Sequence, residues 1–352
     1  MPMRVKRDEL SGELWRLFTL EEERSTERDV HGRVLAKSLS GDPTVPVISE
    51  FLYERGFRAK WPRGKRFAAC LTHDVDWAYP PPRHTEKVLR GGVGRVPLRA
   101  KVLWRLGSNS GWRLYNPYSL DRIIEVEREF SAVSSFMVKA TPKEWLDEKH
   151  EDLYNLNYLA SRLERLIDNG WEVGLHAGYA SHDNSERLAR EKALLESTLN
   201  GYRVAGVRMH YLRFSYPDTW LAVEAAGFKY DTTLAFPDRP GFRNGMCYPF
   251  HPVVNDRMLN ILEIPLAVMD TTFWGYMRVQ PSEALEMIRE LAYRVERVGG
   301  VLTVLWHNNT FCELLYGEWG RMYRSLLSFL RDRGAWLTNC LNLWEYWVDN
   351  YG

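Results

Sequence analysis

The sequence lacks the features that mark membrane proteins, secreted proteins and nucleic-acid-binding proteins. No run approaches the roughly 18 consecutive apolar residues of a membrane helix, and the N-terminus carries no apolar signal segment. The 47 basic and 46 acidic residues leave a formal charge of +1, so we expect no nucleic-acid partner. The four cysteines are scattered without a Cys-x-x-Cys pair, which favours free buried thiols over a disulfide scaffold. These absences together predict a cytoplasmic protein without a transmembrane segment.

What the sequence does contain is a regular alternation of apolar strand candidates and helical periods. We expect strands at 67–72, 132–138, 171–175, 204–208, 261–266 and 300–306, with 335–338 as a further candidate. Between them, apolar residues recur at helical spacing over 119–130, 151–169, 185–199, 217–226, 281–298 and 318–333. Such alternation predicts a parallel sheet, either closed into a barrel or open and doubly wound. Residues 1–62 are expected to form a helical extension packed on a main domain of residues 63–352.

Polar residues suited to catalysis follow several of these strands. Asp74 and Asp76 lie two positions apart at the end of the first strand, so their side chains point to the same side of the extended chain. Two close carboxylates need a counter-charge to stay ionised together, which predicts a cation site or an acid/base pair. Four histidines also stand at or just after strand-like runs: His176, His182, His210 and His307. Because catalytic residues of a parallel barrel lie at the C-terminal ends of its strands, this placement favours a barrel of about seven strands with a metal-dependent hydrolase site.

The tryptophan content is high, at 14 residues. Three tryptophans near strand ends, Trp77, Trp274 and Trp306, could form the walls of a site for a sugar-sized ligand. The plainer interpretation of any one of them is core packing.

The segment 77–117 separates the first two strands and has an unusual composition. It contains Pro80-Pro81-Pro82, and eight basic residues lie between Arg83 and Arg113 against a single acidic one. It is either a lid that contacts an anionic substrate or a phosphorylated membrane surface, or a solvated basic loop.

The order of the motifs resembles the polysaccharide deacetylase family, carbohydrate esterases of family four with the NodB-homology fold, over roughly residues 65–340. The family's Thr-Phe-Asp-Asp resembles Thr72-His73-Asp74-Val75-Asp76, and its His-x-x-x-His resembles the stretch that begins at Gly174-Leu175-His176. Its Arg-x-Pro-aromatic motif resembles Arg208-Met209-His210-Tyr211, its acidic motif the stretch from Glu263 to Asp270, and its Leu-x-His motif Leu305-Trp306-His307. The resemblance implies a distorted (β/α) barrel. The sequence His-Asp-Val-Asp, which stands in place of the usual Asp-Asp motif, indicates a variant branch of the family.

The first departure from the family pattern concerns the two aspartates. In the family they are adjacent, the first acting as general base and the second as a metal ligand, whereas Val75 separates Asp74 from Asp76. The order of the two residues in the motif gives Asp74 the role of general base and Asp76 the role of metal ligand, but the two roles could be exchanged.

The second departure concerns the histidine pair. His182 stands six residues after His176, whereas the family's second histidine follows the first by four. His210, at the family's proline position, is the favoured third protein ligand, and His182 is the alternative. An Asp-His-His set with open positions suits Zn²⁺, and Co²⁺, Ni²⁺ or Mn²⁺ would also fit.

The remaining site residues take their roles from the resemblance. His307 is expected to donate a proton to the leaving group, because the pKa of an imidazole lies near the working pH. Asp270 would pair with His307 and raise its pKa, and Arg208 would orient the base carboxylate and keep it ionised. The backbone N–H of Tyr211 would donate a hydrogen bond to the oxyanion that develops when water attacks the acyl carbonyl.

The expected reaction is hydrolysis of an N-acyl group, most simply an N-acetyl group on an amino sugar or glycan precursor. The substrate would be a carbohydrate or an N-acylated small molecule, phosphorylated or lipid-linked if the basic segment contacts it. Two alternatives remain: hydrolysis of a non-sugar C–N bond of the imide or ureide type, and a non-catalytic barrel that binds glycan. The sequence predicts no oligomeric state.

Overall fold

The computed structural model describes residue 5 and residues 7–39, 41–77, 120–147, 149, 155–311 and 313–352, with only the backbone of residues 25, 313–315 and 317. The basic residues of 83–113 lie outside the described residues, as does all of the predicted insertion except Trp77. The lid and the surface-loop interpretations of that segment therefore stay predictions.

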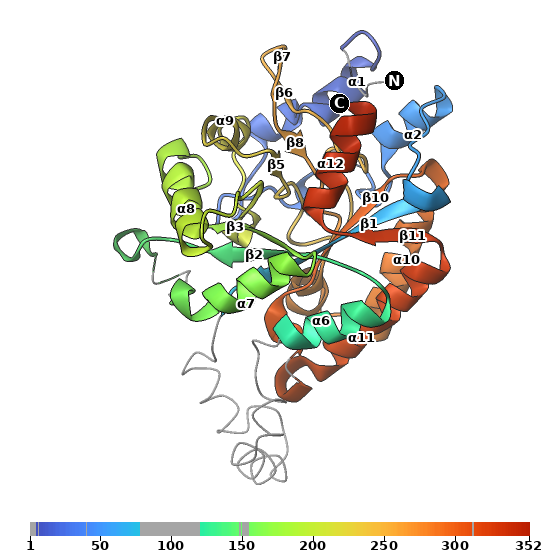
Figure 1. Ribbon diagram of the computed structural model, residues 1–352. Helices are drawn as coiled ribbons and strands as arrows, with labels where there is room; N and C mark the ends of the chain where they lie inside the picture. The colour runs from blue at the N-terminus through green and yellow to red at the C-terminus, as the bar shows by residue number, and fades with distance from the viewer. Residues whose placement is uncertain are drawn as a thin grey trace.

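One parallel sheet, curled into an incomplete barrel, organises the described part of the chain (Figure 1). Eight of its strands follow one another in the order β8-β5-β4-β3-β2-β1-β10-β9, and every neighbouring pair is parallel. Their bounds are β1 (Phe67–Val75), β2 (Ser135–Lys139), β3 (Glu172–Ala177), β4 (Gly206–Met209), β5 (Tyr230–Asp231), β8 (Leu262–Glu263), β9 (Val268–Met269) and β10 (Val301–Leu305). The predicted distorted (β/α) barrel is confirmed.

The barrel is distorted at two places. One side of β1 pairs with β10, whereas on the other side its first half pairs with β11 (Ala335–Thr338) and its second half with β2. The edge strands β8 and β9 are joined through residues 264–267 and do not pair with each other in the described sheet. Since Pro265 lacks a backbone N–H, it interrupts a strand ladder. The strand predicted over 261–266 is therefore present but shorter, because only Leu262–Glu263 pairs in the sheet before the chain crosses to β9 at the other edge.

Helices cover the outside of the sheet (Figure 1). The helix α10 (Pro281–Val298) shows why: its buried residues recur at helical spacing, from Ala284 and Ile288 to Val295, and form one apolar stripe. It ends at Gly299, whose φ of 69° is the left-handed conformation that favours glycine after a helix. The other covering helices are α6 (Leu120–Glu129), α7 (Leu156–Asp168), α8 (Ser185–Thr198), α9 (Asp218–Ala225), α11 (Glu313–Asp332) and α12 (Cys340–Tyr351).

The described residues before β1 pack onto the barrel. They include α1 (Gly12–Phe18) and α2 (Val47–Glu54), and Trp15, Phe18 and Ile48 belong to the same hydrophobic core as β1. Arg28 and Val34 form an antiparallel bridge, so residues 28–34 make a small hairpin. The domain boundary at residue 62 stays a prediction.

Two sequence expectations can be compared with the described residues. Among them, no helix combines the length and apolar character needed to cross a bilayer. Cys70, Cys247 and Cys340 are free and buried, as expected, and Cys312 lies outside the described residues.

Candidate active site

The carboxyl ends of the strands carry most of the predicted site residues. Asp74 lies near the end of β1 and Asp76 directly after it, His176 lies near the end of β3, and His210 follows β4. His307 follows β10, the neighbour of β1 on its other side. Because parallel strands all end at the same rim, residues that are far apart in the sequence meet there.

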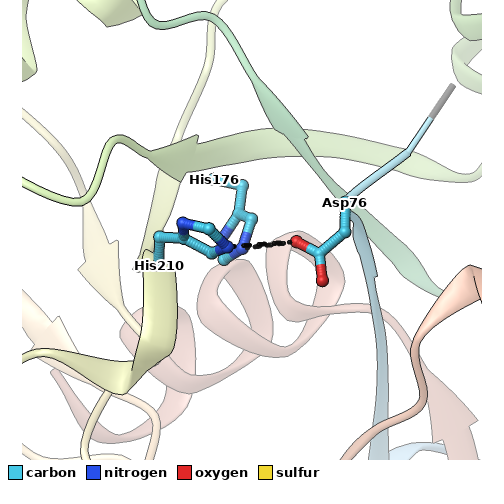
Figure 2. Close-up of side chains that lie close together, drawn as sticks. All are labelled: Asp76, His176 and His210. Atoms are coloured by element: carbon cyan, nitrogen blue, oxygen red, sulfur yellow. Dashed lines mark ion pairs between the residues drawn. The ribbon is translucent and has the colours of Figure 1, made fainter. Parts of the chain in front are cut away.

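Asp76, His176 and His210 form a compact group in which the three side chains point toward one another (Figure 2). The Nε2 atoms of both histidines lie 3.4 Å from Asp76 Oδ1, and the three ligand atoms all lie within 4.8 Å of one another. A separation of 3.4 Å is longer than an ordinary N–H···O bond. It agrees with the roughly 3.3–3.4 Å between two ligands of a tetrahedral zinc ion bound at about 2.0–2.1 Å.

Two further observations favour a cation in this group. His176 Nδ1 lies 3.1 Å from the Arg208 carbonyl, which can only accept, so Nδ1 carries the proton and the Nε2 lone pair faces Asp76. Asp76 Oδ1 is buried and has no hydrogen-bond donor among the described residues. A buried carboxylate oxygen facing an imidazole lone pair is unfavourable unless a positive charge lies between them. The three residues therefore fit a divalent metal ion.

Lys139, at the end of β2, adds a positive charge beside this group. Its Nζ lies 3.5 Å from Asp76 Oδ1 and donates to the Asp76 carbonyl at 3.3 Å. Burial by itself raises the pKa of Asp76, but the charge of Lys139 is the largest of the effects that hold that pKa well below its usual value. Asp76 is therefore ionised at neutral pH.

Asp74 faces the same cavity with a different partner. Its Oδ1 accepts a hydrogen bond from Arg208 NH1 at 3.1 Å, and its Oδ2 lies 3.6 Å from His176 Nε2. Arg208 is fully buried, and three of its other donors bond to the Thr72 hydroxyl and to the carbonyl and hydroxyl of Thr232. The guanidinium is thus fixed in place and can hold the Asp74 carboxylate in one orientation.

His307 and Asp270 form the tightest pair of the site. Asp270 accepts from His307 Nδ1 at 2.6 Å and from the His307 backbone N–H at 2.8 Å, which leaves Nε2 directed to Asp76 Oδ2 at 3.8 Å. Burial lowers the pKa of His307, but the charge and hydrogen bond of Asp270, together with the charges of Asp76 and Asp74, raise that pKa to about 9. His307 can therefore carry a proton at neutral pH.

These side chains surround a cavity of about 230 Å³. Tyr211 and Trp274, both predicted to contact substrate, line the cavity, and so does Trp77. The prediction for Trp306 is corrected, because this side chain is fully buried and packs against Trp319 and Tyr323 in the core. Trp306 begins the turn after β10, and alternation along the strand sends its side chain away from the face that His307 occupies.

His182 lies apart from the three-residue group. It does not line the cavity, and its nearest described acidic neighbour is Asp183, with 3.6 Å between Nδ1 and Oδ1. Burial and the charge of Arg213 lower its pKa to about 4. The structure therefore places His210, and not His182, beside Asp76 and His176.

Arg33 is a cavity residue that sequence reasoning missed, and it comes from the hairpin of residues 28–34. Its NH1 donates to the Tyr211 carbonyl at 3.0 Å and its NH2 to the Tyr276 hydroxyl at 2.7 Å, while Asp29 holds Nε and NH2. Tyr211 and the residue after it have positive φ values of 62° and 54°, which are strained for non-glycine residues. Arg33 thus stabilises the turn that carries His210.

No signal in the sequence connects Arg33 with the strands of the barrel. Lys139 was also missed, although it directly follows a predicted strand and pairs in register with His176. The strand-end rule that selected His176 would have found Lys139.

Similar proteins were found by structure but not by sequence. No protein-family model matches the chain, and no curated protein matches it. The fold is similar to a putative polysaccharide deacetylase from Mycobacterium smegmatis, with a TM-score of 0.54 and 20% identity over 84% of this chain and 96% of that one. It is similar to Puue allantoinase, with a TM-score of 0.54 and 13% identity over 92% and 98%.

A probable polysaccharide deacetylase from Pseudomonas aeruginosa PAO1 is a third solved structure with this fold. Its TM-score is 0.50, with 13% identity over 82% of this chain and 93% of that one. At such low identity these likenesses show the fold alone. The chain therefore has the fold of polysaccharide deacetylases and an allantoinase, together with a candidate Asp-His-His metal site.

Proposed function

We propose that the chain is a metal-dependent hydrolase that removes an N-acyl group, most simply N-acetyl, from an amino sugar or glycan precursor. The observation that carries the proposal is the arrangement around one cavity. The Asp76–His176–His210 group lies between the Asp74–Arg208 pair and the Asp270–His307 pair. A cation site with a base on one side and an acid on the other is what hydrolysis of a C–N bond requires.

Asp76, His176 and His210 would hold a divalent ion, zinc in this proposal, with cobalt, nickel or manganese as substitutes. When bound, such an ion polarises an acyl carbonyl and lowers the pKa of water. The two histidines reach the ion position through Nε2, the atoms that already face Asp76.

The other side chains would move the protons. Asp74 accepts the proton of the attacking water, and Arg208 holds its carboxylate in one orientation. His307, protonated and held by Asp270, donates a proton to the departing nitrogen. The backbone N–H of Tyr211 would donate a hydrogen bond to the oxyanion of the tetrahedral intermediate.

A second candidate function is hydrolysis of a cyclic imide or ureide. The fold is compatible with it, because an allantoinase structure shares this fold over 92% of the chain. The same residues would serve this chemistry, since both reactions hydrolyse a C–N bond next to a carbonyl.

The test is hydrolysis by zinc-loaded protein of N-acetylated amino sugars and their oligomers, compared with allantoin and other cyclic ureides. Release of acetate supports deacetylation, whereas ring opening without acetate supports the second candidate. Asp74→Asn and His307→Ala should each lose turnover while they keep the metal. Asp332→Asn, an exposed aspartate on α11, is the matched control and should stay fully active.

A zinc-loaded protein that binds glycan but hydrolyses none of these substrates would contradict both candidates. It would instead support the non-catalytic alternative.

A further inference from the structure

Lys139 is a buried lysine at the candidate metal group that has no role in the proposed mechanism. Its side chain is only 7% exposed, and it lines the cavity together with Asp76 and His176. Lysine is almost never buried to this extent unless it is paired, because its ammonium group loses hydration. The buried charge of Lys139 must therefore be stabilised by the charges around it.

The charges around the cavity are already balanced before a metal ion is added. Among the described residues, Asp74 is paired with Arg208 at 3.1 Å and Asp76 with Lys139 at 3.5 Å. Asp270 bonds His307, so no further carboxylate of the described lining is available. A divalent ion would bring two additional positive charges into a cavity where water screens charge poorly. A hydroxide ion offsets one of them, and the second calls for another anion.

Resting on the proposed function, we propose that Lys139 binds an anionic oxygen group of the substrate, a carboxylate or a phosphate, beside the bond that is hydrolysed. The substrate class is then an N-acylated compound with its own negative charge, rather than a neutral sugar. Lysine suits this role because its ammonium has three donors on a flexible stem. It can turn from Asp76 to a ligand when a metal ion takes over that carboxylate.

The size of the cavity and the contacts of Arg33 both favour Lys139 as the residue that binds the anionic group. At about 230 Å³, the cavity is smaller than the roughly 300–1,000 Å³ of many small-molecule sites, so a group bound at Lys139 lies close to the reacting carbonyl. Arg33 is the other lysine or arginine among the described lining residues, but its guanidinium already holds Asp29, the Tyr211 carbonyl and the Tyr276 hydroxyl.

The first test measures binding and requires no turnover. Zinc affinity, by competition with a chelator, and affinity of the zinc-loaded protein for inorganic phosphate and for acetate are compared in wild type and Lys139→Met. We expect zinc to bind at least fivefold more tightly to the variant, because a competing positive charge is gone. We expect phosphate or acetate to bind at least tenfold more weakly, and the probe that loses more affinity identifies the group.

Two controls separate charge from structure. Lys139→Arg keeps the charge and should bind the anions within about threefold of wild type. Lys192→Met removes a lysine of α8 whose Nζ bonds the Gly227 carbonyl, away from the cavity, and should change neither affinity. If Lys139→Met does not fold, Lys139→Gln carries the same expectations, because it keeps a polar side chain of similar length.

The second test uses substrates that differ in charge. N-acetylglucosamine 6-phosphate and N-acetylmuramic acid carry a phosphate and a carboxylate, and N-acetylglucosamine carries neither. Lys139→Met should lower kcat/KM at least tenfold for a charged substrate and less than threefold for the neutral one.

The possible failures are distinguishable. If wild-type protein binds no zinc, the proposed function fails and this inference fails with it. If zinc binds but Lys139→Met leaves phosphate and acetate affinity unchanged, only the role of Lys139 is overturned.

Discussion

Histidine–carboxylate contacts lie on both faces of the end of β1, and the two faces differ in one respect. On the inner face, Asp76 faces His176 and His210 at 3.4 Å, and its Oδ1 has no hydrogen-bond donor among the described residues. On the outer face, His73 Nε2 lies 3.0 Å from Glu127 Oε1, and both side chains are completely buried. Glu127 also accepts hydrogen bonds from the side chains of Ser134, Trp171 and Tyr323.

The difference separates a structural network from a functional one. The acceptors of Glu127 are matched by the side-chain donors of Ser134, Trp171 and Tyr323, and this network stabilises the packing of α6 and α11 against β1. The inner group is incomplete, since its acceptor atoms face one another around a shared position. Burial and short distances are common to both, and only the matching of donors with acceptors distinguishes them.

The largest expected effect comes from breaking the inner group. His176→Ala should abolish stoichiometric zinc binding and lower hydrolysis by about a thousandfold, because a catalytic metal supplies several kcal/mol of transition-state stabilisation. Metal analysis after dialysis and the hydrolysis assay would show it. Urea unfolding of the metal-free variant should stay close to wild type, and a variant that keeps its zinc would contradict the assignment.

Breaking the outer network should act on stability instead. Glu127→Ala leaves the buried donors of Ser134, Trp171 and Tyr323 without their acceptor, so the free energy of unfolding should fall by about 3–5 kcal/mol in urea titrations. The folded fraction should bind zinc as wild type does. Glu129→Ala, on the exposed end of the same helix, is the control and should cost less than about 0.5 kcal/mol. An equal loss of unfolding free energy in Glu127→Ala and Glu129→Ala would contradict a stabilising role of the Glu127 network.

The pH dependence of stability should sharpen the comparison further. The pKa of His307 is raised to about 9 in the folded protein, against about 6.5 in an unfolded chain. The stabilisation by protonated His307 is therefore complete below pH 6.5 and is lost as the pH rises through about 9. In metal-free protein this amounts to on the order of 3 kcal/mol between pH 6.5 and 10. Urea titrations across that range would measure it, and His307→Gln should flatten the profile.

The smallest expected effect concerns the wall of the inner site. Arg33→Met removes the bond to the Tyr211 carbonyl and loosens the turn that carries His210. We expect kcat to fall about fivefold, roughly 1 kcal/mol, while zinc still binds. The control is Arg203→Met, whose side chain is 91% exposed and should have no effect. A kcat unchanged in Arg33→Met would show that the turn holds its conformation without this contact.

Much of the architecture could be predicted from the sequence, because long apolar strands and amphipathic helices leave periodic patterns. The resemblance to the polysaccharide deacetylase family predicted that Asp74 pairs with Arg208 and His307 with Asp270, and the structure contains both pairs. The metal-ligand, base and acid roles of these residues stay predictions, because no bound ion or substrate tests them.

The rest could not be predicted, for physical reasons. β5 and the hairpin of β6 (Val253–Val254) and β7 (Arg257–Met258) are strands of two residues, too short for any periodicity to appear. The helix α12 was also missed. Arg33 reaches the site from a hairpin outside the barrel, and only tertiary packing places it there.

The hairpin of residues 28–34 has a practical consequence for anyone who shortens this protein. A fragment cut at residue 63, where the barrel-forming sequence starts, would keep every strand and every candidate ligand. It would nevertheless lose the guanidinium that spans Tyr211 and Tyr276, and one wall of the pocket would be opened to solvent. The minimal unit for enzymology therefore begins before the hairpin, not at the first strand.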